Sequence, residues 1–157
     1  MFSLCIHTMR VLYLSAFLAI IGAQTYPLAL YTEPLSAVEV CSSPNALAKN
    51  FAVSISTDTP TKGENVSTTF DFDLDAPITG GTAKYSATLN GFGPYTSQAN
   101  LCDETAKTAD PCPLAVGHHH EVSSSASTVT GKLITTITWV NDAGAEILCA
   151  RITTKTV

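Results

Sequence analysis

The stretch Phe70-Asp71-Phe72-Asp73-Leu74-Asp75 alternates apolar and acidic residues with a period of two. Successive side chains of a β-strand point to opposite faces, so this order places three apolar side chains on one face and three carboxylates on the other. Because an unpaired carboxylate is costly to bury, the acidic face must meet water while the apolar face meets a core. The stretch therefore predicts a half-buried strand.

The same period recurs along the chain. Residues 51–56 and 84–90 alternate in the same way, and residues 133–140 and 147–154 form runs rich in β-branched side chains. Clusters of Gly, Pro and Asp separate these segments, as expected for turns. Beyond residue 23, no stretch repeats apolar residues at helical spacing, so no helix is predicted. Several short strands between turns favour an all-β fold, namely an immunoglobulin-like sandwich of two antiparallel sheets.

The N-terminus has the three parts of a secretory signal peptide. Arg10 precedes the apolar run Val11–Ile21, which is followed by the small residues Gly22 and Ala23. The run is too short to span a bilayer, which needs about 20 apolar residues. We expect cleavage after Ala23, and hence a protein that is secreted to the outside or delivered to a lysosomal or vacuolar lumen.

Removal of residues 1–23 leaves 134 residues, enough for one domain. We divide them into an N-terminal extension, 24–40, and a β-sandwich domain, 41–157. Seven basic and thirteen acidic residues give the remaining chain a formal charge of −6. Phosphate binding needs clustered Lys and Arg, so this balance argues against a nucleic-acid partner. Asn65-Val66-Ser67 is the one glycosylation sequon, and its polar surroundings favour a surface position for Asn65.

Four cysteines follow the signal peptide, and an even number in an oxidising compartment predicts two disulfides. Pairing Cys102 with Cys112 closes a short segment, which we expect to be a hairpin. Pairing Cys41 with Cys149 ties the start of the domain to its last strand. The two other connectivities, which link the middle of the domain to its ends, stay open at this point.

The sequence contains no pattern typical of an enzyme or a metal centre. On a strand, His118 and His120 share one face while His119 and Glu121 share the other, so three adjacent histidines cannot bind one ion. The aspartates at 71, 73 and 75 lack the Gly and terminal Glu of a calcium loop. The serines at 123–125 and 127 belong to no nucleophile elbow. We therefore predict no catalytic residue, no metal and no cofactor.

The cysteine neighbourhoods resemble those of a known family. Cys41-Ser-Ser-Pro44, Cys102-Asp-Glu104, Cys112-Pro-Leu-Ala-Val-Gly117 and Trp139-Val-Asn-Asp-Ala-Gly144 before Cys149 are similar in order and spacing to the ML lipid-recognition domain. That family includes phosphatidylglycerol/phosphatidylinositol transfer proteins, the soluble Niemann–Pick type C sterol carrier and secreted mite allergens. The likeness covers roughly residues 38–157. Many animal members have a third disulfide near the N-terminus, for which this chain has no cysteines.

The resemblance implies two slightly splayed sheets with an apolar cavity between them that holds a lipid. The alternation of the strands agrees with an apolar interior. We expect two groups of lipid-binding side chains, one on the inner faces and one in a Gly-flanked loop at the cavity entrance or a membrane-touching tip. The inner-face group is Phe51, Val53, Ile55, Phe70, Phe72, Leu74, Tyr85, Ala87, Leu89, Ile137, Trp139, Leu148, Ala150 and Ile152, and the loop group is Phe92 and Tyr95.

Two functions remain for a secreted protein of this kind. The first is a monomeric lipid carrier that holds a sterol or a phospholipid, touches membranes transiently and performs no chemistry. The second is a secreted recognition module of immune or host-interaction type, in which any lipid is incidental or structural. Mutation of the predicted entrance residues Phe92 and Tyr95, compared with mutation of the outward-facing Asp71 and Asp73, would distinguish the two.

Overall fold

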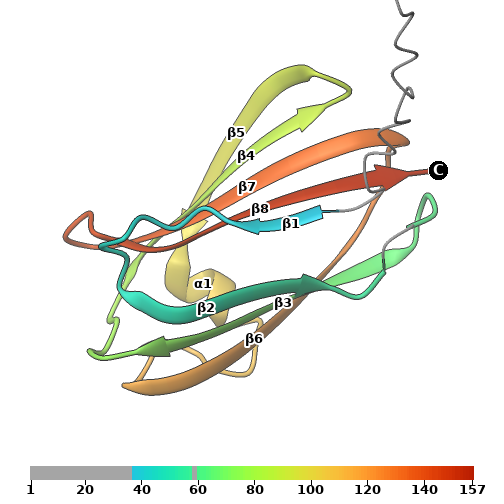
Figure 1. Ribbon diagram of the computed structural model, residues 1–157. Helices are drawn as coiled ribbons and strands as arrows, with labels where there is room; N and C mark the ends of the chain where they lie inside the picture. Colours follow the sequence, from blue (N-terminus) through green and yellow to red (C-terminus); the bar gives the residue numbers. More distant parts are fainter. Residues whose placement is uncertain (1–36, 58–59) are drawn as a thin grey trace, which may run out of the picture. The chain divides into compact units, whose positions relative to one another are not determined.

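The computed structural model describes residues 37–57 and 60–157 (Figure 1). The expected signal peptide and residues 24–36 of the expected extension therefore lie outside the described residues. None of the described residues belongs to a helix long and apolar enough to cross a membrane. The elements, in chain order, are β1 (Ala37–Val40), β2 (Ala48–Ile55), β3 (Asn65–Leu74), β4 (Gly81–Leu89), β5 (Phe92–Asn100), α1 (Leu101–Thr105), β6 (Gly117–Ala126), β7 (Gly131–Asn141) and β8 (Glu146–Thr156).

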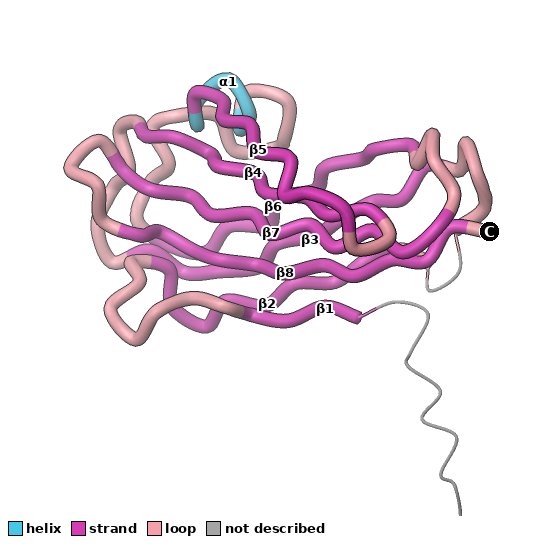
Figure 2. The backbone as a smooth tube through the Cα atoms, turned by 90° about the horizontal axis from the view of Figure 1, so that it is seen from above, coloured by secondary structure: helices cyan, strands magenta, loops and turns pink. Residues whose placement is uncertain are grey.

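The strands form two antiparallel sheets that face each other (Figures 1 and 2). The five-stranded sheet has the order β1-β8-β7-β4-β5, and the three-stranded sheet has the order β2-β3-β6. This arrangement confirms the predicted immunoglobulin-like sandwich. β1 is an edge strand in which Val40 lies opposite Ala150 of β8. Thus residues 37–40, assigned from the sequence to the extension, pair with the last strand of the sandwich.

The alternating residues 70–74 belong to β3, which occupies the centre of the three-stranded sheet. Phe70, Phe72 and Leu74 are buried, whereas the alternating aspartates lie on the outer face. In the pairing with β6, Phe70 lies opposite Glu121 and Phe72 lies opposite His119. Side chains of directly opposed residues share a face, so this register directs both polar side chains of β6 toward the interior.

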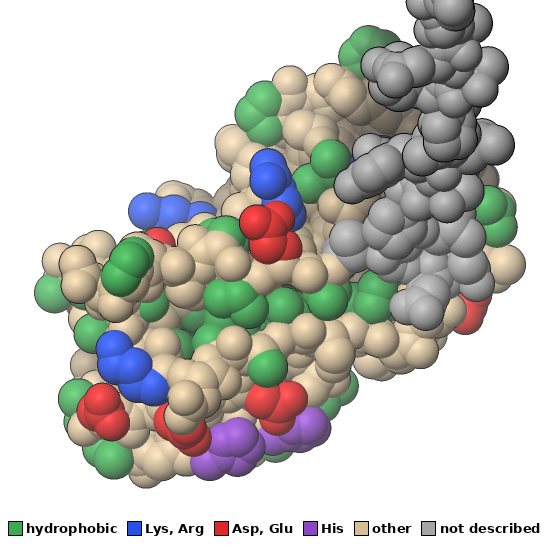
Figure 3. Space-filling view, viewed as in Figure 1, with side chains coloured by type: hydrophobic (Ala, Val, Ile, Leu, Met, Phe, Trp, Pro, Cys, Tyr) green, Lys and Arg blue, Asp and Glu red, His purple; other side chains and the backbone are tan. Residues whose placement is uncertain are grey.

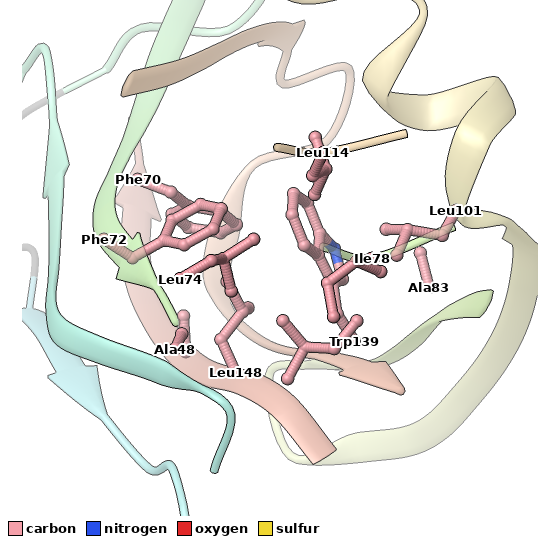
Figure 4. Packing of buried hydrophobic residues seen from close by; sticks show 12 residues of the cluster. Ala48, Phe70, Phe72, Leu74, Ile78, Ala83, Leu101, Leu114, Trp139 and Leu148 are labelled. Atoms are coloured by element: carbon pink, nitrogen blue, oxygen red, sulfur yellow. The ribbon is translucent and has the colours of Figure 1, made fainter. Parts of the chain in front are cut away.

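The hydrophobic core fills one half of the space between the sheets. Phe70 and Phe72 of β3 approach Trp139 of β7 edge to face, with ring centroids 5.7 and 6.1 Å apart (Figure 4). Burial of each large apolar side chain contributes roughly 1.5–3 kcal/mol. The cluster is drawn from the C-terminal halves of β3 and β7 and the N-terminal half of β8, among other segments, and comprises Ala48, Phe70, Phe72, Leu74, Ile78, Ala83, Leu101, Leu114, Trp139, Ile147, Leu148 and Ala150.

Both disulfides have the pairing that the sequence favoured over two open alternatives. Cys41 is bonded to Cys149, with Cα atoms 4.9 Å apart, and joins the segment after β1 to β8. Cys102 is bonded to Cys112, with Cα atoms 5.2 Å apart, and joins α1 to the segment that precedes β6.

Two predictions of local structure are wrong. The segment closed by Cys102 and Cys112 begins with the helix α1 and is not a hairpin. The helix is too short to show a period, and its start depends on the Asn100 side chain, whose Oδ1 accepts a hydrogen bond from the Cys102 backbone N–H at 2.9 Å. Phe92 and Tyr95 lie in the edge strand β5 and not in a loop. β5 is exposed along almost its whole length, so no alternation marked it as a strand.

Candidate functional site

A cavity of about 720 Å³ occupies the half of the sandwich that the core leaves unfilled. Figure 3 shows hydrophobic side chains gathered in a band between the two sheets. The cavity reaches the surface, because exposed residues of β6 and the exposed Lys107 are part of its wall. Its lining residues are Ile55, Pro60, Val66, Thr68, Tyr85, Glu104, Lys107, Thr108, Val122, Ser123, Ser124, Ser125, Ala126, Ser127, Leu133, Thr135, Ile137, Ile152 and Thr154.

The position of the cavity follows from how the strands divide between core and wall. The end of β7 supplies Trp139 to the core, whereas the preceding part of the strand supplies Leu133, Thr135 and Ile137 to the cavity. β8 runs in the opposite direction, so its second half lines the cavity with Ile152 and Thr154. Apolar and hydroxyl side chains share the wall. The cavity is therefore suited to a ligand with an apolar body and some polar groups.

α1 lies beside β4 and β5 (Figure 2) and contributes Glu104 to the cavity wall. The Tyr85 hydroxyl donates to Glu104 Oε2 at 3.0 Å, and Lys107 Nζ donates to Glu104 Oε1 at 2.8 Å. Desolvation, followed by the hydrogen bond to Glu104, raises the pKa of Tyr85 to about 12. The hydrogen bond from Lys107 is the main reason that the pKa of the Glu104 carboxyl is lowered. The contact between Tyr85 and Glu104 ties β4 of the five-stranded sheet to the helix that the Cys102–Cys112 disulfide anchors.

A smaller space of about 70 Å³ extends the cavity inward. It is lined by Phe70, Tyr85, Glu104, Thr105, Thr108, Glu121, Ser123, Ile137 and Trp139, of which Tyr85, Glu104, Thr108, Ser123 and Ile137 also line the larger cavity. We call this space the inner pocket. Among its walls are two buried polar groups without a hydrogen-bond partner, the Glu121 carboxylate and the Trp139 indole N–H.

The wall of the inner pocket includes a buried carboxyl group, that of Glu121. Glu121 is only 3% exposed. Burial is the main cause that raises the pKa of its carboxyl, and the Asp110 carboxylate raises this pKa further, while the Thr108 hydroxyl and the imidazoles of His119 and His120 oppose the rise. The Thr108 hydroxyl itself donates to the Thr105 carbonyl at 2.7 Å.

His119 anchors the strand next to the inner pocket. Its Nδ1 lies 3.0 Å from Asp110 Oδ2, and its Nε2 lies 2.8 Å from the Ala115 carbonyl oxygen. A neutral imidazole donates from one nitrogen only, so the imidazolium form satisfies both acceptors. Asp110, His119 and Glu121 could group around an ion, since one ligand atom of each lies within 4.8 Å of the others. However, both nitrogens of His119 are already hydrogen-bonded, which makes this group a structural anchor for β6.

The two other histidines of the triplet, His118 and His120, share one face, as predicted, and the structure places that face outward. His118 Nδ1 lies 3.0 Å from Asp73 Oδ1, and His120 Nδ1 lies 2.6 Å from Asp71 Oδ1. Hydrogen bonds from Asn50 and then from His118 lower the pKa of Asp73. Figure 3 shows these histidines beside acidic side chains over the three-stranded sheet. This ladder joins β3 to β6 on the outer face, away from the cavity.

A second hollow, of about 350 Å³, lies on the outer face of the five-stranded sheet. Its walls come from β4, β5 and β7, with Lys84, Thr96, Gln98 and Thr136 among them. It is about half the volume of the inner cavity and is formed by one sheet alone, so the inner cavity, which both sheets line, is the better candidate site.

The residues predicted to bind lipid fall into four groups in the structure. Ile55, Tyr85, Ile137 and Ile152 line the cavity, and Phe70 and Trp139 line the inner pocket. Phe72, Leu74, Leu148 and Ala150 are buried in the core, and Phe51 and Val53 pack against it. Ala87 and Leu89 are half-buried on β4 without lining either space. Phe92 and Tyr95 are 73% and 65% exposed on β5 and are separate from the cavity wall.

Many of the lining residues were not predicted from the sequence, and three examples show why. Leu133 and Thr135 could have been found by continuing the alternation of Ile137 and Trp139 backward along β7. The serines of β6 line the cavity, although the sequence suggested no role for them. Glu121 was assigned to the same face as His119, but nothing in the sequence showed that this face is the inner one.

Comparison with known proteins agrees with this architecture. The model of the ML domain family matches residues 36–156 of the chain. The chain therefore belongs to the ML domain family, as its cysteine neighbourhoods indicated. Comparison with curated protein sequences gives no significant match.

Two solved structures have the same fold. A Niemann–Pick type C2 protein from the Japanese carpenter ant is 14% identical, with a TM-score of 0.55, and the match covers 77% of this chain and 99% of that one. Chicken MD-1, crystallised in complex with lipid IVa, is 20% identical, with a TM-score of 0.56, and the match covers 76% of this chain and 88% of that one. At these identities the likeness establishes the fold.

Proposed function

We propose that this protein is a secreted lipid carrier that holds a sterol or a phospholipid between its two sheets and moves it between membranes. The observation that carries the proposal is the cavity of about 720 Å³ between the sheets. Its volume is within the roughly 300–1,000 Å³ range of small-molecule sites. Residues of both sheets line it, so a bound molecule would contact the two layers at once.

The energetics of an open interior support a bound ligand. Side chains that face an empty space lose the dispersion contacts that a filled core supplies. A lipid that withdraws about 300 Å² of apolar surface from water gains roughly 7 kcal/mol, before the costs of ordering. Thr68, Thr135 and Thr154 lie in the same wall, and their hydroxyl groups can form hydrogen bonds with a polar part of the ligand.

Other observations support the remaining parts of the proposal. MD-1, which has this fold, was crystallised with lipid IVa. Two disulfides suit an oxidising compartment such as the extracellular space. The exposed Phe92 and Tyr95 on β5 offer aromatic side chains for a transient contact with a membrane surface. The carrier acts through binding alone, as a monomer and without a cofactor.

The direct test is mass spectrometry of lipids extracted from protein that was purified from a secreting host without delipidation. We expect a near-stoichiometric sterol or phospholipid. Delipidated protein should then take up that lipid and move it between donor and acceptor vesicles. A folded protein that contains no lipid and takes none up on titration contradicts the proposal and favours a recognition module.

Two substitutions on one strand provide a matched control. Thr135 and Thr136 are neighbours on β7, but Thr135 lines the cavity and Thr136 lies in the outer hollow. Thr135→Phe should fill part of the cavity and weaken lipid uptake at least about tenfold, which corresponds to about 1.4 kcal/mol of binding free energy. Thr136→Phe should leave uptake unchanged. An equal reduction in both variants would show that the effect is not specific to the cavity.

A further inference from the structure

Three side chains that can bind a metal ion converge where the segment before β6 meets the inner face of that strand. They are the carboxylates of Asp110 and Glu121 and the imidazole of His119, and one ligand atom of each lies within 4.8 Å of the others. His119 and Glu121 are buried, whereas the Asp110 side chain is 42% exposed. The cluster is therefore largely enclosed, and an ion can reach it from solvent past Asp110.

The Glu121 carboxylate needs a partner that the protein does not supply. Neither of its oxygens has a hydrogen-bond partner among the described residues, and both are buried. Leaving such a group unpaired costs about 1–3 kcal/mol, and more when it is charged. Glu121 cannot turn outward without a change in the pairing of β6, because it lies opposite the buried Phe70 of β3. Native proteins satisfy nearly all buried polar groups, and an ion is one way to do so.

The charges of the cluster favour a cation as that partner. The carboxylates of Asp110 and Glu121 face one imidazole, and Asp110 is close enough to raise the pKa of the Glu121 carboxyl. Even with His119 in its imidazolium form, one negative charge is left uncompensated. The imidazole of His120 faces outward, where its Nδ1 lies 2.6 Å from Asp71 Oδ1. A divalent cation would compensate both carboxylates.

The contacts of His119 suit a metal ligand. Its Nε2 lies 2.8 Å from the Ala115 carbonyl oxygen, which can only accept, so Nε2 carries a proton. Metal-binding histidines typically donate one ring N–H in this way, which fixes the ring and directs the other nitrogen to the ion. The other nitrogen, Nδ1, lies 3.0 Å from Asp110 Oδ2. A metal ion can replace the proton between these two atoms while the Ala115 contact persists, so ion binding is compatible with the anchoring role of His119.

The donor atoms select the kind of ion. One imidazole nitrogen and two carboxylate oxygens suit Zn²⁺, which takes four ligands at about 2.0–2.2 Å. Ca²⁺ takes six to eight oxygen ligands and Mg²⁺ requires octahedral oxygen coordination, so neither matches this set. Ligands of a tetrahedral zinc ion are roughly 3.3 Å apart, so the cluster has to close by up to about 1.5 Å from its limit of 4.8 Å. Asp110, outside any strand or helix, can supply this movement.

We propose that Asp110, His119 and Glu121 bind a Zn²⁺ ion, with water in the fourth position. The ion joins the segment 106–116 to β6 and compensates the buried charge of Glu121. The sequence predicted no metal, because strand alternation places only His119 and Glu121 on one face, and the third ligand comes from a segment whose path depends on tertiary structure. The inference goes beyond lipid carriage and does not depend on it.

Titration of Zn²⁺ tests the site directly. Untagged full-length mature protein is treated with EDTA, dialysed and titrated with Zn²⁺ in a calorimeter. We expect one ion to bind, and Ca²⁺ at the same concentrations not to bind. Co²⁺ in place of Zn²⁺ should give the visible absorption bands of a four-coordinate site, which a cluster without a bound ion cannot produce.

Two conservative substitutions and one control locate the ion. Glu121→Gln and Asp110→Asn keep the size of the side chain but remove an anionic ligand. Each should weaken Zn²⁺ binding at least about tenfold, since even the loss of a group that only supports a ligand costs that much. The control is the double variant His118→Ala/His120→Ala, which removes the two outward-facing histidines (Figure 3) and should leave the affinity unchanged.

Thermal unfolding gives a second readout. Added Zn²⁺ should raise the Tm of wild type and of the control variant, because a ligand that binds only the folded state stabilises it. It should leave the Tm of Glu121→Gln unchanged. In EDTA, Glu121→Gln should not lower the Tm, since it removes an unpaired buried charge. A merely structural role for Glu121 would give the same effect of the substitution with and without Zn²⁺.

The possible outcomes decide the inference. One-to-one binding that depends on Asp110 and Glu121 and survives in the control variant supports it. Binding that is lost only in the control variant places the ion on the outer face and overturns it. A folded wild-type protein that binds no Zn²⁺, or binding that survives Glu121→Gln, also overturns it. Lipid uptake is measured separately, so the proposed function stands or fails independently of these results.

Discussion

The imidazole of His119 stacks on the phenyl ring of Phe72, with ring centroids 5.2 Å apart and 21° between the planes. The two residues face each other across the β3–β6 pairing, on the inner side of the three-stranded sheet. His119 is only 4% exposed, whereas its neighbour His118 lies on the outer face. Adjacent residues of the same type therefore have opposite structural roles.

This contrast predicts different costs for two identical substitutions. His119→Ala removes a stacked ring and leaves Asp110 and the Ala115 carbonyl without their partner, so we expect a loss of about 2–4 kcal/mol in the free energy of unfolding. His118→Ala, at the surface, should change it by less than about 0.5 kcal/mol. Urea unfolding of both variants measures the difference. Equal effects would contradict the inward direction of His119.

Glu121 should make stability depend on pH in an identifiable direction. Burial raises the pKa of its carboxyl, so between the ordinary pKa and the raised one the folded state binds more protons than the unfolded state. The contribution of Glu121 to stability therefore falls as pH rises through this interval and stays low above it. Glu121→Gln should remove this fall, and the stability of the variant relative to wild type should increase with pH.

At neutral pH, Glu121→Leu should stabilise the empty protein by about 1–3 kcal/mol, because it replaces an unpaired buried polar group with an apolar one. Urea unfolding at several pH values tests both Glu121 variants, with Asp75→Asn at an exposed position as the control. A parallel pH dependence in wild type and Glu121→Gln would contradict the burial of this carboxyl.

The two disulfides should differ in what they stabilise. The bond between Cys41 and Cys149 joins residues 108 positions apart, and its removal by paired Cys→Ala substitution should cost up to about 4.7 kcal/mol. The bond between Cys102 and Cys112 spans 10 residues and should cost about 3 kcal/mol or less. Removal of the shorter bond should nevertheless weaken lipid uptake more, because it frees α1, which lines the cavity.

Denaturant unfolding and vesicle uptake assays of the two paired variants test this expectation. Uptake is compared at a denaturant concentration where both variants are folded. If removal of the longer bond then reduces uptake more, α1 keeps its position without its disulfide, which contradicts the prediction.

The phenol of Tyr85 should ionise at a higher pH than that of an ordinary tyrosine. Desolvation and the hydrogen bond to Glu104 raise its pKa to about 12. Spectrophotometric titration should detect one phenol ionising near that pH, and Tyr85→Phe should abolish that step. Glu104→Gln should lower the pKa of Tyr85 only partly, since desolvation is the larger cause. A Tyr85→Phe titration curve identical in shape to wild type would contradict the contact.

Much of the fold was predictable from local patterns. The alternation around Phe72 identified a half-buried strand because a strand buried on one face must place its carboxylates on the other. The runs at 133–140 and 147–154 identified β7 and β8 in the same way, and the spacing around Cys102 and Cys112 indicated the family. These signals depend only on neighbours in the sequence, so they could be recognised without coordinates.

Elements whose form depends on distant contacts were missed. β5 is an exposed edge strand, and it is ordered by pairing with β4 along one side, which leaves no apolar period. α1 is shorter than any period, and it is held by the Asn100 cap and a disulfide. In both cases the stabilising partner is outside the segment, so the local sequence carries little information about it.

By itself, the sequence determined the class of fold, the disulfide-bonded character of the domain and which residues alternate on each strand. The tertiary structure alone decided which alternating residues line a cavity and which fill the core. That division arises because β3, β7 and β8 each pass from a packed half of the sandwich to an open half, as they do at Trp139 and Thr135 of β7. It also decided that Glu121 faces the interior, because the face of β6 that is buried depends on its register with β3, a relationship between segments about 50 residues apart.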